Sequence, residues 1–377
     1  MNAVSPMVQR RPGARPVMPI VIAAGGTGGH FFPAEALAQE LVGRGHTMAL
    51  ITDARSEGLR SAMFAGREVF VLRGAGLAGR GVKAVAALVA LAAGTVQARA
   101  VLARLQPSVI VGFGGYPCVA PVLAAQTLRR RPVVVLHEQN AVLGRANRFL
   151  ARFSDRLALG MDGTRGLPGV TSVVVGNPVR AEILSFTPSP RTNSETESGR
   201  FSLLVTGGSL GARVLSDVVP AAIALLPGDV RGRLSVVQQC RVEDLARVTA
   251  AYAALGVPVE LAAFFPDMAA RLSSASLVVG RAGASTVAEL GVMGLAAILV
   301  PLPGAIDGHQ LQNALASGAI TIEQNGFTAE VLAGQLSGLM GDPARLAALG
   351  QSVAARGRLD AASRLADLVE TYLGNHP

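Results

Sequence analysis

The chain of 377 residues has no tryptophan, only three tyrosines and only two cysteines. Proteins that bind nucleic acid commonly place aromatic side chains among their basic residues, so this shortage argues against a nucleic-acid partner. Cys118 and Cys240 lie in different halves of the chain, and neither belongs to a Cys-x-x-Cys or Cys/His cluster. We therefore expect no metal site, and we interpret both cysteines as reduced thiols in the core of a cytoplasmic protein.

Long apolar runs are also missing. A membrane span needs about 18 apolar residues, whereas the longest apolar run, Ala84 to Ala93, follows Lys83 and stops at Gly94. Residues 1–16 contain three arginines, and no apolar core follows them before the first predicted strand, which argues against a secretory signal. We expect these residues to form a disordered basic leader.

The charge is unevenly distributed. Residues 1–180 carry 21 Lys and Arg against 8 Asp and Glu, whereas residues 181–377 carry 13 against 17. A one-sided positive field favours an acidic partner, and with nucleic acid disfavoured this points to an anionic membrane surface or anionic lipid. The alternative is that an arginine-rich proteome simply uses arginine as its surface charge, since 33 of the 34 basic residues are Arg.

Two glycine-rich turns of one design lie half a chain apart, at Gly25 to His30 and at Gly207 to Ala212. Each follows an apolar run that predicts a buried strand, Pro19 to Ala24 and Ser202 to Thr206, and each precedes a segment with helical spacing. In such a turn, backbone N–H groups can approach a phosphate while the helix adds its positive end. The pair predicts two nucleotide-type domains with a cleft between them; the alternative is that the glycines merely end strands.

Strand and helix alternate through both halves, which predicts α/β domains with doubly wound parallel sheets. In the first half a helix is expected from Pro33 to about residues 43–45, and further strands are expected at His46 to Thr52, Val109 to Val111 and Val133 to Leu136. A polar stretch at residues 187–199 predicts a surface loop.

Ligands of such sheets bind beyond the carboxyl ends of the strands. Polar or glycine clusters occupy those places at Gly112 to Tyr116, His137 to Asn140, Phe264 to Asp267, Arg281 to Thr286 and Pro301 to Gln310. Within the fourth cluster and the helix behind it, Glu289 follows Ser285 by one helical turn on the same face. That spacing suits a carboxylate that binds ribose hydroxyls while the helix N-terminus holds a diphosphate.

A basic, glycine-rich stretch, Arg73 to Lys83, runs into Ala84 to Leu91, which is apolar on every face. Such a helix either lies in a core or docks at a bilayer surface with its flanking cations toward the lipid headgroups. For the second case the predicted membrane contacts are Arg80, Val82, Lys83, Val85, Leu88 and Val89.

Seven motifs, taken in order, resemble those of the MurG family of N-acetylglucosamine transferases: Gly25 to His30, Gly114 to Tyr116, His137 to Asn140, Gly176 to Arg180, Gly207 to Ser209, Arg281 to Ala284 and His309 to Ala314. The resemblance spans roughly residues 18–370. It implies a GT-B fold, in which two Rossmann-like domains enclose a cleft.

The family resemblance also implies the domain roles and the reaction. Residues 17–179 would form the membrane-facing acceptor domain, residues 180–358 would bind the UDP-sugar, and a helix within residues 359–377 would return to the first domain. The enzyme would move N-acetylglucosamine from UDP to the 4-hydroxyl of the N-acetylmuramoyl group of an undecaprenyl-diphosphate pentapeptide, with inversion. It would be a peripheral protein on the cytoplasmic face of the bacterial inner membrane, act in peptidoglycan synthesis, and need no cofactor.

Site residues follow from the same resemblance. His30 is the expected base, because an imidazole titrates near neutral pH; alternatively it only positions a substrate. The implied donor residues are Thr27, Gly28, Gly29, Asn140, Arg180, Ser209, Phe265, Ser285, Thr286, Glu289 and Gln310. The implied acceptor residues are Gly114, Gly115, Tyr116, Glu138 and Asn147, although Glu138 could instead order its loop. Two positions depart from the family: Leu210 replaces a glutamine, and Ala78 stands where a cation is expected.

Two rival functions remain. A nicotinamide oxidoreductase would use Asp53 for a ribose, but Phe31 occupies the third glycine position of the fingerprint and the second half would be unexplained. A non-catalytic lipid-carrier binding or scaffold protein would keep the basic first half, yet it need not keep Glu289 together with Gln310.

Overall fold

The structure is a computed structural model that describes residues 18–25, 28–54, 62–72, 82–186, 200–208 and 211–373, without the side chains of residues 62, 82–84 and 306. The predicted leader, the predicted loop at 187–199, and the sites at Thr27, Ala78, Arg80, Ser209 and Leu210 lie outside the described residues. So do the side chains of Val82 and Lys83.

The first sheet has seven parallel strands in the order β3-β2-β1-β4-β5-β6-β7. Its strands are β1 (Ile20–Ala23), β2 (Met48–Asp53), β3 (Glu68–Leu72), β4 (Val109–Gly112), β5 (Val133–Glu138), β6 (Arg156–Leu159) and β7 (Ser172–Val174). Its helices and short 3-10 turns are α1 (Gly28–Gly43), η2 (Ala62–Phe64), α2 (Val82–Leu105), η3 (Tyr116–Cys118), α3 (Val119–Ala125), α4 (Arg145–Leu150) and η4 (Ala151–Phe153).

The second sheet has six parallel strands in the order β10-β9-β8-β11-β12-β13. They are β8 (Phe201–Thr206), β9 (Leu234–Gln239), β10 (Val259–Ala262), β11 (Leu277–Gly280), β12 (Ala297–Leu299) and β13 (Ile320–Thr321). The remaining elements are α5 (Ala181–Ser185), α6 (Arg213–Ala224), α7 (Gly228–Gly232), η5 (Val242–Asp244), α8 (Leu245–Leu255), α9 (Met268–Ser274), α10 (Ala284–Met293), η6 (Ile306–Gly308), α11 (His309–Ala316), η7 (Gln324–Gly326), α12 (Ala329–Gly341), α13 (Pro343–Ala354) and α14 (Ala361–Glu370).

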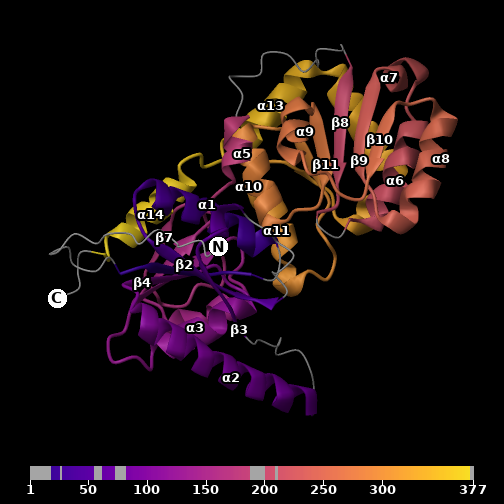
Figure 1. The fold of residues 1–377 in the computed structure, drawn as a ribbon. Helices are drawn as coiled ribbons and strands as arrows, with labels where there is room; N and C mark the ends of the chain where they lie inside the picture. The colour runs from indigo at the N-terminus through magenta and orange to yellow at the C-terminus, as the bar shows by residue number, and fades with distance from the viewer. Residues whose placement is uncertain are drawn as a thin grey trace, which may run out of the picture.

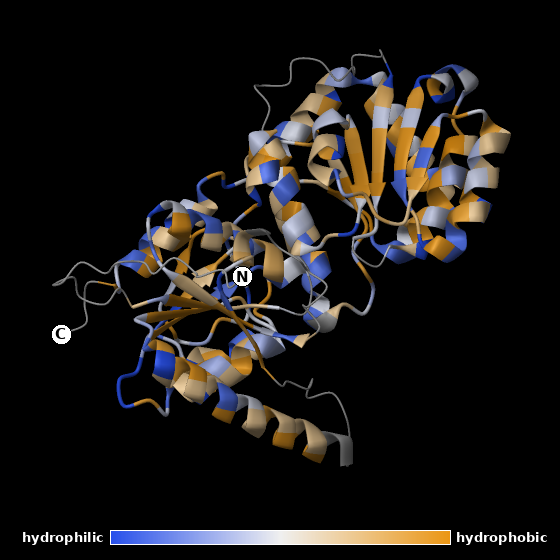
Figure 2. Cartoon of the chain, viewed as in Figure 1, coloured by the Kyte–Doolittle hydropathy of each residue, from blue (hydrophilic) through white to orange (hydrophobic). Residues whose placement is uncertain are grey.

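Both sheets are covered by helices on their two faces, and the central strands are apolar along their whole length (Figures 1 and 2). Burial on both faces explains this composition, because neither set of alternating side chains meets water. The two faces of each sheet carry separate apolar cores. The predicted fold of two doubly wound α/β domains is confirmed.

Helix α1 begins at Gly28, earlier than the expected start at Pro33. Proline lacks a backbone N–H, so its place inside the helix removes one hydrogen bond without ending the helix. Strands β3, β6 and β7, which were not predicted, lie toward the two edges of the first sheet. Edge strands are less deeply buried, and β3 and β7 are largely exposed, so their apolar pattern is weak.

Helix α2 continues through Gly94, where the apolar run was expected to stop. By length and composition alone, its segment Val85–Leu105 could cross a membrane. Its second half belongs to the first domain, because Ala98 and Leu102 are fully buried in the core beneath the sheet. Its first half reaches beyond the sheet (Figure 1).

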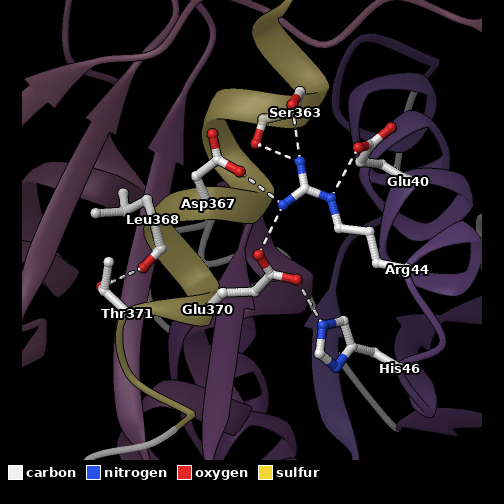
Figure 3. A network of polar contacts seen from close by, with 8 residues as sticks. All are labelled: Glu40, Arg44, His46, Ser363, Asp367, Leu368, Glu370 and Thr371. Carbon is white, nitrogen blue, oxygen red and sulfur yellow. Dashed lines mark hydrogen bonds and ion pairs between the residues drawn. The ribbon is translucent and has the colours of Figure 1, made fainter.

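Helix α14 packs on α1, far from the elements that precede it in the chain (Figure 1). Its apolar side chains enter the core of the first sheet. Figure 3 shows the polar contacts at this junction: Arg44, which directly follows α1, contacts Glu40 at 2.8 Å, Asp367 at 2.6 Å and Glu370 at 2.7 Å. His46 contacts the other oxygen of Glu370 at 2.7 Å. The C-terminal helix therefore ties the end of the chain to the first domain.

Candidate active site

The carboxyl ends of β1, β4 and β5 lie side by side at the centre of the first sheet. The strand order reverses between β1 and β4, and in such sheets this point forms the binding crevice. His30 stands in the first turn of α1 with the predicted donor residues Gly28 and Gly29. Gly114 and Gly115 follow β4. The start of α1 and the loop after β4 thus meet at one place.

The imidazole of His30 lies against a backbone surface. A Cβ atom on Gly115 would lie 3.4 Å from His30 Cδ2 and 3.5 Å from His30 Nε2. Gly114 and Gly115 have φ angles of 82° and 71°, a region that disfavours residues with a side chain. The Cδ2 and Nε2 atoms of His30 therefore lie next to a backbone position that carries no side chain. Tyr116, half-buried, follows at the start of η3.

Behind His30 lies a buried row of hydrogen bonds. His30 Nδ1 is 2.9 Å from Gln139 Oε1, and Gln139 Nε2 is 3.0 Å from His137 Nδ1. His137 Nε2 lies 3.0 Å from the Gly176 carbonyl oxygen. Burial lowers the pKa of His137 to about 4, so this imidazole is neutral at physiological pH.

Glu138 and Asn147, predicted to bind the acceptor, are both buried within the protein. One Glu138 oxygen accepts from the N–H and the side-chain amide of Asn140, and the other accepts from the Gly144 N–H and from Asn147. Both carboxylate oxygens are thus engaged within the chain. The geometry favours the alternative, in which Glu138 orders the loop, and it gives Asn147 the same supporting place.

The second glycine turn follows β8 in the second sheet. A Cβ atom on Gly207 would overlap the backbone of Ala212, so only glycine fits there. The N-terminus of α10 lies at the same edge, because β11, which precedes α10, pairs with β8. Near that N-terminus, the hydroxyl of Ser285 is buried and has no hydrogen-bond partner among the described residues. A polar group without a partner next to a helix N-terminus suits an anionic ligand.

Glu289 forms an ion pair with Arg180, whose Nη2 lies 3.0 Å from Glu289 Oε1. The Glu289 side chain is 13% exposed and the Arg180 side chain 22% exposed. Burial raises the pKa of Glu289, and the Arg180 charge acts against that rise. The Arg180 guanidinium also lies 4.5 Å from the ring centroid of Phe32 on α1. Arg180 therefore connects α1, the helix that carries His30, with the predicted ribose site on α10.

Asn313 of α11 was not among the predicted site residues, although it lies in one of the recognised motifs. It is fully buried, and its Oδ1 accepts from the Ala141 N–H at 2.8 Å. Its Nδ2 donates to Asn140 Oδ1 at 3.0 Å and to the Ala282 carbonyl at 3.1 Å. Asn313 thus joins loops of the two domains. The signal that could have found it is its position one helical turn after Gln310 on the same face.

Other predicted donor residues follow the carboxyl ends of strands in the second sheet. Gln310 accepts a hydrogen bond from the Leu302 N–H at 3.0 Å, and Thr286 is half-buried in the first turn of α10. Phe265 is buried beneath Arg271, whose guanidinium lies 4.0 Å from the ring centroid. Arg271 therefore covers the ring of Phe265. Among the described residues no group of three or more His, Cys, Asp and Glu could hold a metal ion.

The first half of α2 exposes the apolar side chains that were predicted to contact a membrane. Val85, Leu88 and Val89 are 61%, 58% and 64% exposed. Ala87 between them is buried, so the helix is not exposed on every face. Apolar residues recur along this helix in Figure 2.

Two protein-family models match this chain. Residues 20–159 match the glycosyltransferase family 28 N-terminal domain, and residues 202–365 match the C-terminal domain of that family. A protein of Granulibacter bethesdensis is 55% identical over 361 residues, covering 94% of both chains, and one of Acidiphilium cryptum is 52% identical over 357 residues, covering 93% of this chain and 96% of the other. Both are named UDP-N-acetylglucosamine–N-acetylmuramyl-(pentapeptide) pyrophosphoryl-undecaprenol N-acetylglucosamine transferase.

A solved structure also resembles this chain. The crystal structure of Acinetobacter baumannii MurG superimposes with a TM-score of 0.74 at 27% identity, covering 94% of this chain and 99% of that chain. Its two-domain GT-B architecture is the one described above. The chain therefore belongs to glycosyltransferase family 28, among the MurG N-acetylglucosamine transferases.

Proposed function

We propose that this chain transfers N-acetylglucosamine from UDP-N-acetylglucosamine to the 4-hydroxyl of the N-acetylmuramoyl group on an undecaprenyl-diphosphate pentapeptide, a step of peptidoglycan synthesis. Family membership and the names of the relatives support the donor and the lipid-linked acceptor. The observation that carries the proposal is the junction at α1, where Arg180 of the Glu289 pair lies on Phe32, two residues after His30. A nucleotide bound at Glu289 would therefore bring its sugar toward His30.

For the donor, Glu289 would accept hydrogen bonds from the ribose hydroxyls, and the Phe265 backbone would read the uracil. The N-terminus of α10 with Ser285 and Thr286, and the turn containing Ser209, would hold the diphosphate. Asn140 and Gln310 would contact the sugar. The Arg180 guanidinium, already beside Glu289, would shift toward the nucleotide when the ribose takes its place.

For the acceptor, the bare backbone at Gly114 and Gly115, with Tyr116 and the turn at Thr27, would hold the lipid diphosphate. In the reaction, His30 Nε2 would take the proton of the acceptor 4-hydroxyl while the hydroxyl oxygen forms a bond to C1 of N-acetylglucosamine. The bond between C1 and the phosphate oxygen would break, and UDP would leave with its charge stabilised by the α10 N-terminus and the glycine turn. Attack from the side opposite UDP inverts the anomeric carbon.

A peripheral position on the cytoplasmic face of the inner membrane would bring the chain to its lipid substrate. Exposed Val85, Leu88 and Val89 would enter the acyl boundary, and Arg80 and Lys83 would face anionic headgroups, with Val82 beside them. Sedimentation with vesicles tests this. Anionic vesicles should bind more protein than neutral ones, and salt should remove only part of the binding; equal binding to both at low salt would contradict the electrostatic contribution.

Calorimetric titration separates the proposed function from its rivals. UDP-N-acetylglucosamine should bind and release heat, whereas NADH should not bind. Binding of NADH alone would favour the oxidoreductase. Binding of the acceptor lipid without turnover in the presence of UDP-N-acetylglucosamine would favour the scaffold.

A further inference from the structure

We infer that Gln139 is a positioning residue that holds the proton of the neutral His30 imidazole on Nδ1 and thereby leaves the lone pair on Nε2, the ring nitrogen that lies next to Gly115. This inference rests on the proposed base role of His30. It follows from the hydrogen-bonding capacity of each group in the row, taken from the buried end outward.

The row begins at a carbonyl. Gly176 O can only accept, so His137 Nε2, at 3.0 Å, must carry the hydrogen of that bond. His137 is fully buried and neutral, with its pKa lowered to about 4, so its one proton is on Nε2. His137 Nδ1 therefore has a lone pair and acts as an acceptor.

The side-chain amide of Gln139 is oriented by acceptors. Its Nε2 lies 3.0 Å from His137 Nδ1, 3.0 Å from the Phe113 carbonyl oxygen and 3.1 Å from the His137 carbonyl oxygen. All three are acceptors and would repel an amide oxygen, so the NH₂ group with its two hydrogens faces inward and Oε1 faces His30. Gln139 is 1% exposed, so its amide is shielded from bulk solvent.

The orientation of Gln139 fixes the tautomer of His30. An amide oxygen only accepts, so His30 Nδ1, 2.9 Å away, carries the hydrogen. A neutral imidazole has one N–H, so His30 Nε2, which lies next to Gly115, is unprotonated. After Nε2 takes a proton, the Nδ1–H bond to Gln139 persists and the imidazolium keeps its orientation.

Without an acceptor at Nδ1, the proton of His30 could occupy either ring nitrogen. Every molecule with the proton on Nε2 would then lack the unprotonated Nε2 that acts as the base. Gln139→Met removes the amide while keeping a side chain of similar length. The matched control is Gln126→Met, because Gln126 also donates to backbone carbonyls of this domain, Val122 and Phe153, but is not bonded to His30.

Nitrogen NMR measures the tautomer directly, and the chain's five histidines make the spectrum of ¹⁵N-histidine-labelled protein tractable. The His30 signal, assigned by its loss in His30→Ala, should show a protonated Nδ1 and an unprotonated Nε2 in the unchanged protein. Gln139→Met should populate the Nε2–H form, and Gln126→Met should not. A wild-type His30 protonated on Nε2 would overturn the inference without the need for any variant.

Kinetics give the second readout. Gln139→Met should lower kcat by about 10- to 100-fold, part of the usual contribution of a positioned base, while the KM for UDP-N-acetylglucosamine changes little. A kcat equal to that of Gln126→Met would overturn the positioning role. An active His30→Ala protein would remove the base role alone, and the wild-type spectrum would still decide the tautomer, so the two failures are distinguishable.

Discussion

Replacing Glu289 with alanine tests whether the predicted donor site binds the nucleotide. The substitution removes a carboxylate that is 13% exposed and leaves the Arg180 guanidinium without its ion-pair partner. A hydrogen bond to a charged group contributes about 1.5 to 3 kcal/mol, so UDP and UDP-N-acetylglucosamine should both bind about 10- to 150-fold more weakly. The binding affinity of the two ligands should fall by the same factor, because both carry the ribose that Glu289 would hold.

The same substitution affects stability. Breaking a fully buried ion pair costs about 3 to 5 kcal/mol, but both partners here are partly exposed, so we expect the free energy of unfolding to fall by about 1 to 2 kcal/mol. Glu289→Gln keeps the volume and one acceptor oxygen, so it should be the milder variant in both respects. Urea unfolding measured beside the titrations separates lost binding from lost folding.

The pH dependence gives an independent check. Burial raises the pKa of Glu289 above the ordinary carboxyl value, so protonation begins at a higher pH than for an exposed glutamate. UDP affinity should therefore weaken as the pH falls through that raised value, and this dependence should disappear in Glu289→Gln. A folded Glu289→Ala protein that binds UDP as tightly as the unchanged protein would refute the assignment and place the nucleotide elsewhere.

Three further predictions concern the framework of the site. Gly176→Ala should lower the free energy of unfolding in urea by about 1 to 3 kcal/mol, because the φ angle of Gly176 is +92° and an added Cβ would lie too close to the segment that leads into α14. An unchanged midpoint of urea unfolding would contradict this. His46 and then Arg44 hold the pKa of Glu370 below its usual value, so Glu370→Gln should cost about 0.5 to 1 kcal/mol at pH 7. That cost should disappear as the pH falls from the ordinary pKa through the lower folded value, and a cost that persists at pH 2 would refute the electrostatic cause. Asn313→Ala should raise the KM for UDP-N-acetylglucosamine about tenfold, because the loss of a buried hydrogen-bonded amide costs about 1 to 2 kcal/mol; an unchanged KM would show that the contacts of this amide do not support donor binding.

The fold could be predicted because its signals are local. The turns at Gly207 and around His30 each follow a buried strand and open a helix, so one short segment contains the complete pattern. The edge strands β3 and β7 lack this pattern because much of their surface meets water. The continuation of α2 through Gly94 was missed because glycine weakens a helix without ending it.

The site could be predicted only in outline, because its supporting contacts join distant residues. Gln139 meets His30 across 109 positions, and Asn313 meets the loop after β5 across 172. No periodicity in one sequence encodes such pairs. Glu138 illustrates the limit, since a carboxylate at a strand end can bind a ligand or cap a loop, and only the hydrogen bonds that it makes in the folded chain favour the second role.

The most direct test of the central claim is the release of UDP by purified protein supplied with UDP-N-acetylglucosamine and a synthetic undecaprenyl-diphosphate N-acetylmuramoyl-pentapeptide acceptor. UDP should appear only when both substrates are present, with a β-linked disaccharide lipid as the product. His30→Ala should lower the rate by about two to four orders of magnitude while UDP binding stays near normal. Absence of turnover by the unchanged protein with both substrates bound would contradict the transferase assignment, and a His30→Ala protein that keeps more than about a tenth of the rate would contradict its base.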